Sequence, residues 1–219
     1  MNQPVVYIVD DDAAVRGGFA LLCETAGLKV ECFESAESFL AAYRSDVSGC
    51  LVLDVRMGGM SGPDLHTALI RRGSQLPIIY VTAHGDIPMT VRAMKAGAVD
   101  FLTKPVQAAE LLDRVQAAIG RNVDSLNKAE AVATQRQRLL LLTQRERDIL
   151  LLAAAGRANK VIAKRLGISY RTVETHRSHI LHKMGTANFL ELAQLAVDCG
   201  FALESGEPLP AAGAIRPDS

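Results

Sequence analysis

Residues 50–57 have the sequence Cys-Leu-Val-Leu-Asp-Val-Arg-Met, in which four apolar residues run directly into Asp54. The turn-rich stretch Gly-Gly-Met-Ser-Gly-Pro follows at 58–63. A short apolar run bounded by turn residues is typical of a strand buried on both faces of a sheet. Asp54 would then lie at the carboxyl end of the strand, where open α/β sheets bind their ligands. Because a buried carboxylate is costly without a partner, Asp54 indicates either a functional site or a helix N-cap.

The composition is that of a globular protein with one large domain or two ordinary ones. The chain has 219 residues, of which 49% are hydrophobic and 22% are charged. It shows neither a signal-peptide pattern near the N-terminus nor an apolar run of the roughly 20 residues that span a bilayer. We therefore expect a cytoplasmic protein without a membrane partner. The cysteines lack metal-like spacing and are expected to be reduced core residues: Cys23, Cys32, Cys50 and Cys199.

The net charge of zero conceals an asymmetry between the two halves. Residues 1–122 carry 11 Lys/Arg against 14 Asp/Glu, a net charge of −3. Residues 123–203 carry 12 against 7, a net charge of +5, and residues 204–219 carry 1 against 3. An acidic first half and a basic second half suggest two tasks, the second of them on nucleic acid.

Apolar runs and helical periods alternate five times in the first half. The expected strands cover residues 5–9, 29–33, 50–54, 77–81 and 99–103, and a helical pattern follows each of them. Ser35 is expected to cap the second helix only partially, because Ser38 stands where a full capping box has Glu or Gln. Strands that alternate with helices predict an α/β domain with a doubly wound parallel sheet.

Polar residues follow four of these strands and would meet at one edge of the sheet: Asp10, Asp11, Asp54, Thr82 and Lys104. Carboxylates packed together repel, and Mg²⁺ (or Mn²⁺) relieves that repulsion by binding one or two of them beside water and phosphate oxygens. A cation, a lysine and a hydroxyl suit phosphoryl transfer to Asp54 as the nucleophile. Each residue alone also fits a turn or a surface charge, but their joint occurrence at strand ends argues against coincidence.

These residues resemble the receiver domain of two-component response regulators over roughly residues 4–121, through segments 9–12, 53–57, 81–83 and 101–105. The resemblance implies a flavodoxin-like fold and a phosphoacceptor, Asp54, that is served by a sensor histidine kinase. It also implies the following roles: Asp10, Asp11, Asp54 and the Arg56 backbone carbonyl as Mg²⁺ ligands, Thr82 and Lys104 as phosphoryl-stabilising residues, Thr82 and Phe101 as switch residues, and a cis peptide at Lys104-Pro105.

The same resemblance carries two further expectations. The family usually has proline where this chain has Gly58, and because glycine loosens the backbone we expect altered loop order and phosphoryl lifetime. Phosphorylation is expected to move Thr82 and Phe101 and so to change a dimerising face on the fourth helix and fifth strand, although composition alone would make Phe101 a plain core aromatic. Residues on or near that face are Val91, Arg92, Met94, Lys95 and Ala98.

The second half is expected to begin with a helical linker. From Gln107 to about Arg138 there is no proline and a single glycine, Gly120, so the linker is expected to be helical. Continuity with the fifth helix and a short coiled coil are the two alternatives for its arrangement. Thr143 and Glu146 then form a capping box before a helix that ends near residue 156. Three more helices are expected at 159–166, with Val161, Ile162 and Leu166 inward, at 171–184, and at about 189–199.

Two short helices joined by a turn at Gly167 are the helix-turn-helix signature. The second of them carries basic residues on its polar positions, which suits a helix that enters the major groove. His179 and His182 are three residues apart, but no carboxylate or cysteine stands at ligand spacing, so a metal site there is disfavoured.

Residues 143–199 resemble a LuxR-type output domain, through segments 142–147, 159–163, 171–177 and 183–185. By that resemblance, three residues would face base edges in the major groove: Glu174, Thr175 and Ser178. A Glu174 contact would favour the amino group of cytosine. The resemblance assigns mostly phosphate contacts to Lys160, Arg171, Thr172, His176, Arg177 and Lys183.

The sequence thus predicts a receiver at 1–121, a helical linker at 122–140, an all-α, four-helix DNA-binding domain at 141–203 and a disordered tail at 204–219. We expect a transcription regulator of the FixJ/NarL class that catalyses only its own aspartyl phosphorylation and dephosphorylation. Its expected partners are a sensor kinase, a second copy of the chain, double-stranded operator DNA and RNA polymerase. The alternatives are a regulator with a vestigial receiver and a Mg²⁺-dependent phosphohydrolase; Arg56 argues against the latter, because it occupies the place of the required general acid.

Overall fold

The structure, a computed structural model, describes residues 3–44, 47–83 and 87–199. The tail that we expect at 204–219 lies outside the described residues. The chain divides into two compact units, residues 1–128 and 129–219. The division falls within helix α5 (Ala108–Leu140), so the linker is helical and continuous with the fifth helix, as the sequence suggested.

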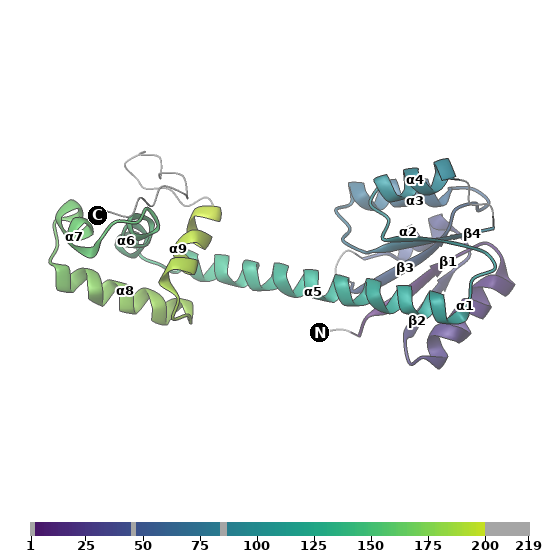
Figure 1. Cartoon of the computed structure of the whole chain (residues 1–219), viewed down its shortest axis with the longest axis horizontal. Helices are drawn as coiled ribbons and strands as arrows, with labels where there is room; N and C mark the ends of the chain where they lie inside the picture. Colours follow the sequence, from purple (N-terminus) through teal and green to yellow (C-terminus); the bar gives the residue numbers. More distant parts are fainter. Residues whose placement is uncertain (1–2, 45–46, 84–86, 200–219) are drawn as a thin grey trace. The chain divides into compact units, whose positions relative to one another are not determined.

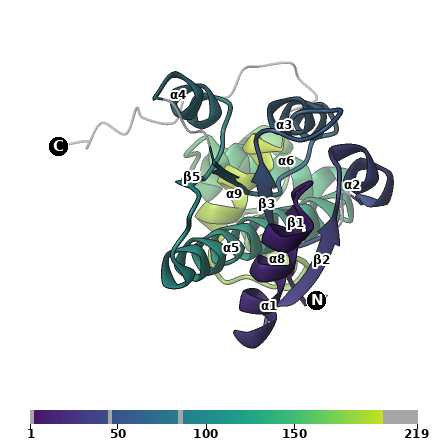
Figure 2. The ribbon, with the colours of Figure 1, turned by 90° about the vertical axis from the view of Figure 1, so that its right-hand side faces the viewer.

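The first unit is a five-stranded parallel sheet with helices on both faces, which confirms the predicted fold. The strand order is β2-β1-β3-β4-β5, from β1 (Val5–Val9), β2 (Lys29–Phe33), β3 (Gly49–Asp54), β4 (Ile78–Thr82) and β5 (Asp100–Thr103). Helices α2 (Ala36–Ala42), α3 (Gly62–Arg71) and α4 (Ile87–Lys95) lie on one face, and α1 (Ala13–Thr25) and the first part of α5 on the other (Figures 1 and 2).

Two hydrophobic cores hold these layers together. Every residue of β1, β3 and β4 is buried, because helices cover both faces of the central strands. Tyr7 and Leu53 face a core that contains Phe39 of α2, whereas Val52 faces one that contains Leu111 of α5. Each fully buried side chain of this size contributes about 1.5–3 kcal/mol. The alternation of apolar faces therefore fixes the strand register, and with it the edge at which Asp54 lies.

Side-chain caps fix where several helices begin. Asp12 caps α1 by accepting hydrogen bonds from the backbone N–H groups of Ala14 and Val15. At α2 the sequence-based expectation was too weak, because a full capping box is present. The hydroxyl of Ser38 accepts from the Ser35 N–H at 3.3 Å and so takes the place of the expected carboxylate or amide.

Two expectations about buried side chains were wrong. Cys32 is exposed because β2 is the edge strand of the sheet, whereas Cys23 and Cys50 are buried and Cys199 is half-buried. All four thiols are free. Val161 is 49% exposed, because the inward stripe of its short helix passes through Ile162 and Leu166 instead.

The second unit packs four helices around a core that includes the end of α5. They are α6 (Gln144–Ala154), α7 (Asn159–Leu166), α8 (Tyr170–Met184) and α9 (Phe189–Asp198). Leu139 of α5, Ile149, Ile162 and Ile180 are all buried in this core. The predicted capping box of Thr143 and Glu146 is present. In the part of the chain that the structure describes, no helix is both long and apolar enough to cross a membrane.

Candidate functional site

The predicted polar residues converge at the carboxyl edge of the parallel sheet. Asp54 is the last residue of β3 and Thr82 is the last residue of β4. Asp10 follows β1 directly, and Lys104 follows β5. Asp54, Thr82 and Asp10 are buried, with 6%, 1% and 2% of their surfaces exposed, respectively. Strand register brings two carboxylates, a hydroxyl and an ammonium group together, since parallel strands end at the same edge.

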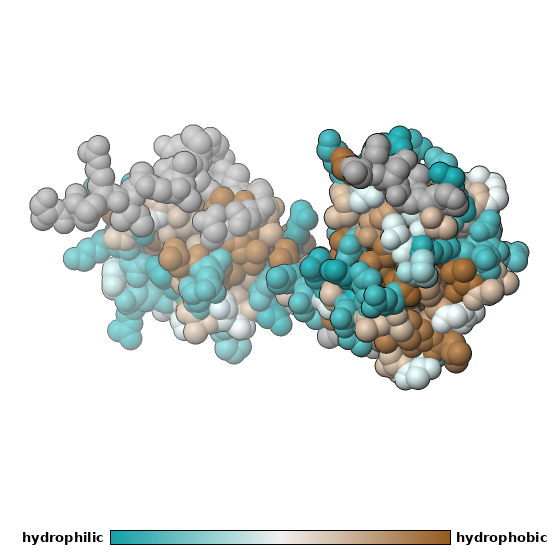
Figure 3. All heavy atoms as spheres, turned by 45° about the vertical axis from the view of Figure 1, so that its right-hand side comes forward, coloured by the Kyte–Doolittle hydropathy of each residue, from teal (hydrophilic) through white to brown (hydrophobic). Residues whose placement is uncertain are grey.

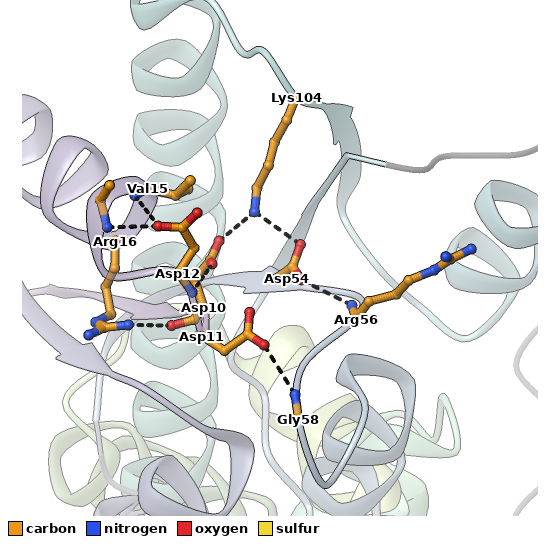
Figure 4. Close-up of polar contacts among 10 residues, drawn as sticks. Asp10, Asp11, Asp12, Val15, Arg16, Asp54, Arg56, Gly58 and Lys104 are labelled. Atoms are coloured by element: carbon orange, nitrogen blue, oxygen red, sulfur yellow. Dashed lines mark hydrogen bonds and ion pairs between the residues drawn. The ribbon is translucent and has the colours of Figure 1, made fainter.

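Lys104 lies between two buried carboxylates (Figure 4). Its Nζ donates to Asp10 Oδ2 at 2.7 Å and to Asp54 Oδ1 at 3.2 Å. The Lys104-Pro105 peptide is cis, as expected. Asp10 Oδ1 also accepts from the Asp12 N–H at 3.0 Å. The ammonium therefore compensates two negative charges that the fold places out of contact with water.

The electrostatics of the two partners differ. Burial raises the pKa of Asp54, and the attraction of Lys104 offsets this only in part. Burial alone would lower the pKa of Lys104, but its hydrogen bonds and attraction to Asp10 and Asp54 outweigh burial and raise that pKa. Burial thus disfavours the ionised form of Asp54, whereas the neighbouring Lys104 stays charged. A carboxylate in this setting has a strong tendency to gain a neutralising partner.

The loop after β3 completes the rim of the site. Asp54 Oδ2 accepts from the Arg56 N–H at 3.0 Å, and the Arg56 side chain points away from the carboxylates (Figure 4). Asp11 is exposed, and its Oδ2 accepts from the Gly58 N–H at 3.2 Å. Backbone groups of this loop therefore orient two of the three carboxylates.

The donor set suits a magnesium ion better than a transition metal. Across the described residues, no three His, Cys, Asp or Glu side chains form a preformed metal cluster. Mg²⁺ is usually bound by one or two carboxylates together with water and phosphate oxygens, and it does not need an all-protein cage. Asp10, Asp11 and Asp54 supply hard oxygen donors at one edge, and the repulsion between them is only partly offset by Lys104. The residues present therefore fit the ion that the receiver resemblance implies.

The two predicted switch residues lie on adjacent strands. Thr82 is paired with Thr103 in the sheet register, and Phe101 is paired with Tyr80. Phe101 is half-buried, with its ring centroid 6.3 Å from that of Tyr80. On the neighbouring α4, Val91 and Met94 are 44% and 45% exposed, whereas Ala98, between α4 and β5, is buried. The face predicted for dimerisation therefore does present apolar side chains to solvent.

A hollow adjoins Lys104 on the other side of the site. Its volume is about 640 Å³, and its walls come from α1 and from the segment between β5 and α5: Val15, Gly18, Phe19, Leu22, Lys104, Pro105, Val106 and Ala108. Figure 3 shows hydrophobic side chains at the surface of this unit among hydrophilic ones. The hollow is mostly apolar and borders Lys104.

The second unit contains the predicted helix-turn-helix. Helix α7 ends at Gly167, whose left-handed φ of 64° allows the sharp turn. Ser169 then caps α8 by accepting from the Thr172 N–H at 3.0 Å. Val173, Ile180 and Met184 anchor one side of α8 in the core. The opposite side is thereby left for contacts outside the unit.

The predicted DNA-contacting residues differ in exposure, and some of them also make contacts within the unit. Six of them are exposed: Lys160, Arg171, Glu174, Thr175, Ser178 and Lys183. Thr172, His176 and Arg177 are half-buried. Arg177 donates to Asn159 Oδ1 at 2.9 Å, and its guanidinium lies 4.0 Å above the centre of the Phe189 ring. Lys183 is also engaged within the unit, since its Nζ donates to Glu146 Oε2 at 2.7 Å.

The sequence indicated only part of this network. Glu146 was recognised as a cap, but its buried carboxylate also pairs with Lys183, 37 residues away. Arg138 of α5 donates to the Met184 carbonyl at 2.9 Å and so caps the end of α8. No local sequence pattern predicts either contact, because each of them joins residues of two different helices.

Comparison with known proteins defines the class of this chain. Residues 6–116 match the profile of the family described as response regulator receiver domain, and residues 140–196 match that of bacterial regulatory proteins, luxR family. The transcriptional regulatory protein TdiR of Thauera aromatica is 42% identical over 99% of this chain and 96% of its own length. FixJ of Azorhizobium caulinodans is 43% identical over 90% of this chain and 93% of its own length.

Solved structures agree with these sequence matches. The response regulator StyR is 43% identical, covers 90% of this chain with the whole of its own, and superposes with a TM-score of 0.79. Full-length FixJ from B. japonicum is 36% identical, covers 91% of this chain with 98% of its own, and has a TM-score of 0.56. The chain belongs to the two-component response regulators that join a receiver domain to a LuxR-type DNA-binding domain. It is a DNA-binding regulator of transcription.

Proposed function

We propose that Asp54 is the phosphoacceptor and that its phosphorylation activates DNA binding. The observation that carries this proposal is the placement of Lys104 between Asp10 and Asp54, with the pKa of Asp54 raised by burial. A carboxylate oxygen of Asp54 attacks phosphorus, the bond to the phosphohistidine nitrogen of a sensor kinase breaks, and the imidazole leaves. The Lys104 ammonium and the Thr82 hydroxyl hold the transferred oxygens.

We propose that Asp10, Asp11, Asp54 and the backbone carbonyl of Arg56 hold Mg²⁺ or Mn²⁺. Bound there, the cation would neutralise charge on the phosphoryl oxygens. The kinase would approach through the apolar hollow between α1 and the start of α5, because Lys104 forms part of its wall. The functional domains would be the receiver at 1–121, the linker at 122–140 and the DNA-binding domain at 141–203.

Activation would pass from Thr82 and Phe101 to the exposed apolar face of α4 and β5. Moving a two-state receiver from 1:99 to 99:1 requires roughly 5.5 kcal/mol of differential stabilisation. A phosphoryl group adds about −1.5 to −2 charges and strong acceptor oxygens beside Lys104, which is an interaction of suitable size. The phosphorylated protein would then dimerise through that face and bind a two-fold DNA operator.

In the second unit we assign base contacts to Glu174, Thr175 and Ser178, which α8 exposes opposite its buried side. Phosphate contacts are assigned to Lys160, Arg171, Thr172, His176, Arg177 and Lys183. RNA polymerase is the partner expected for the complex on the operator, since the chain is a transcription regulator.

The test is the substitution Asp54→Asn in the full chain. It is expected to abolish ³²P labelling by a phosphohistidine donor, together with donor-dependent dimerisation measured by light scattering. Asp113→Asn, an exposed aspartate of α5, is the matched control and is expected to behave like wild type. Labelling that persists in Asp54→Asn would refute the assignment. Equal operator affinity with and without the donor would favour a vestigial receiver, and turnover of p-nitrophenyl phosphate would favour a hydrolase.

A further inference from the structure

The loop after β3 is tied to two separate elements. The Gly58 N–H donates to Asp11 Oδ2 at 3.2 Å (Figure 4), and the Met60 N–H donates to Glu37 Oε1 at 2.8 Å. Asp11 follows β1, and Glu37 lies in the first turn of α2. The loop is thus held between a carboxylate of the candidate metal site and a carboxylate outside it.

The Gly58 N–H fixes the orientation of Asp11. Asp11 is exposed, so its side chain would otherwise sample several rotamers. A carboxylate has about four lone-pair positions, so one backbone hydrogen bond leaves the others available to a cation. Hydrogen bonds to a ligating carboxylate orient it, and losing such a partner typically costs 10- to 100-fold in metal affinity. The donor at residue 58 is therefore placed where it would tune the site.

Glu37 in turn holds the loop in the position from which Gly58 donates. Its hydrogen bond from the Met60 N–H lowers the pKa of its carboxyl group, so Glu37 is ionised at neutral pH. Its Oε1 also fills the space beside Gly59, where a Cβ would come within 2.8 Å of it. Residue 59 has a φ of +87°, which favours glycine. The contact with Glu37 and the left-handed backbone conformation of Gly59 together define the conformation of the loop after β3.

We propose that the Gly58 N–H is a positioning group for Asp11 and that Glu37 holds it in place, so that this loop sets the affinity of the receiver for Mg²⁺. The inference rests on the proposed function of the acidic site. A proline at residue 58 would have no N–H to donate, so the hydrogen bond to Asp11 depends on a residue other than proline there.

A matched pair of substitutions at one position isolates the N–H. Gly58→Pro removes the donor, whereas Gly58→Ala keeps it. A Cβ at residue 58 would have no atom within 4 Å, and φ there is not in the left-handed region, so the alanine side chain is accommodated. The measurement is isothermal titration calorimetry of the unphosphorylated full chain with MgCl₂. We expect Gly58→Pro to raise Kd about 10-fold and Gly58→Ala to bind within about two-fold of wild type.

A second pair tests the role of Glu37. Glu37→Ala removes the acceptor for the Met60 N–H and is expected to weaken Mg²⁺ binding, though less than Gly58→Pro does. Glu37→Gln keeps an oxygen acceptor and is expected to restore binding. Thermal melting of each variant shows whether the fold is retained. Hydrogen exchange at residues 57–61 should rise in Glu37→Ala and not in Glu37→Gln, which a general loss of stability would not produce.

The outcomes separate this inference from the proposed function. Asp11→Asn should abolish Mg²⁺ binding; if wild type itself binds no Mg²⁺, the metal site is wrong and the loop proposal falls with it. If wild type binds and Asp11→Asn does not, but Gly58→Pro binds like wild type, only the loop proposal is overturned. Equal weakening by Gly58→Pro and Gly58→Ala would also overturn it, because the N–H would then not be the cause.

Discussion

At the scale of single residues, Asp54 carries its negative charge where water barely reaches it. Only 6% of its surface is exposed, and burial raises its pKa despite the contact with Lys104. A raised folded-state pKa means that the ionised form costs stability above that pKa. The cost disappears as pH falls below the pKa of the unfolded chain, where Asp54 is protonated in both states.

The substitution Asp54→Asn should therefore stabilise the first unit. In Mg²⁺-free buffer at pH 7 we expect a gain of about 1 kcal/mol, because the neutral amide avoids the burial penalty and Asp10 remains as a partner for Lys104. The gain should shrink near pH 4, since wild type then loses the same charge by protonation. Hydrogen exchange of the sheet amides at both pH values measures it. A variant that is less stable than wild type, or a gain that does not depend on pH, would contradict this account.

Two lysines of the second unit should behave differently when their charge is removed. Lys160 is exposed, whereas Lys183 is paired with the buried carboxylate of Glu146. Lys160→Ala is expected to lower the slope of log affinity against log salt by about 1 and to leave the melting temperature unchanged. Lys183→Ala is expected to lower the melting temperature, because it leaves the buried carboxylate of Glu146 without its positively charged partner.

Filter-binding titrations at several salt concentrations, together with calorimetric melting, distinguish these effects. A full unit of salt slope lost in Lys183→Ala would show that its phosphate contact persists beside the pair with Glu146. An unchanged slope in Lys160→Ala would remove that residue from the interface.

The positions of the polar residues at the edge of the sheet were predictable, but the backbone groups that orient the carboxylates were not. Asp10, Asp54, Thr82 and Lys104 lie where the alternation of strands and helices predicted, because strand ends follow directly from apolar runs. The donation from Gly58 to Asp11 joins residues 47 positions apart and uses a backbone N–H, which every residue except proline has. The identity of residue 58 therefore says that a donor exists and does not say which acceptor it reaches.

At the scale of elements, α5 is fastened to the sheet by one buried amide. Asn122 is 4% exposed; its Oδ1 accepts from the Gly49 N–H and its Nδ2 donates to the Gln75 carbonyl, both at 2.9 Å. One side chain thus joins α5 to the beginning of β3 and to the loop before β4. Nothing in the sequence marked this asparagine, because an Asn within a helix is ordinarily a solvent-facing residue.

Asn122→Ala should loosen this part of α5. The Gly49 N–H, in a buried hydrogen bond, and the Gln75 carbonyl, in a partly buried one, would lose their partner, at a cost of about 2 kcal/mol in the stability of the first unit. Asn127→Ala, an exposed asparagine on the same helix, is the matched control and should change stability by less than about 0.5 kcal/mol. Hydrogen exchange along α5 provides the measurement. Equal protection in the two variants would show that the buried amide does not secure the helix.

Element boundaries were predicted well, and the errors have a physical pattern. Strands β1 and β2 and helix α7 have the predicted bounds, because clear apolar runs and a terminal glycine define them. The orientation of Val161 was wrong because the inward side of α7 passes through Ile162 and Ala163, which are buried, and leaves Val161 facing solvent. The exposure of Cys32 follows from strand order, which composition does not reveal.

At the scale of the whole molecule, the two units have separate hydrophobic cores that share no buried residues. One unit contains the candidate Mg²⁺ site, and the other contains the helix-turn-helix. A ligand that binds only the folded form of one unit stabilises that unit by mass action, by about 2.7 kcal/mol at a concentration of 100 times Kd. We expect MgCl₂ at that level to protect residues 1–128 against urea and to leave residues 129–199 unchanged.

Hydrogen exchange that is read out for individual peptides measures the two units separately. It is recorded at increasing urea concentrations in buffers without CaCl₂, so that Mg²⁺ is the only added divalent cation. Asp11→Asn is the control, since it should abolish the protection of the first unit. Protection of the second unit by Mg²⁺ in the unphosphorylated chain would contradict independent unfolding.

Two glycines near Asp54 are required by space and not by chemistry. A Cβ at Gly49, the first residue of β3, would lie 1.8 Å from the Val5 carbonyl oxygen, and one at Gly62, the first residue of α3, would lie 2.3 Å from the Asp54 carbonyl oxygen. Neither position has room for a side chain, so a substitution there would displace the backbone that carries Asp54 without changing any charge at the site. A variant at Gly49 or Gly62 therefore reports on steric exclusion, whereas a variant of equal size and different charge at Asp54 reports on chemistry.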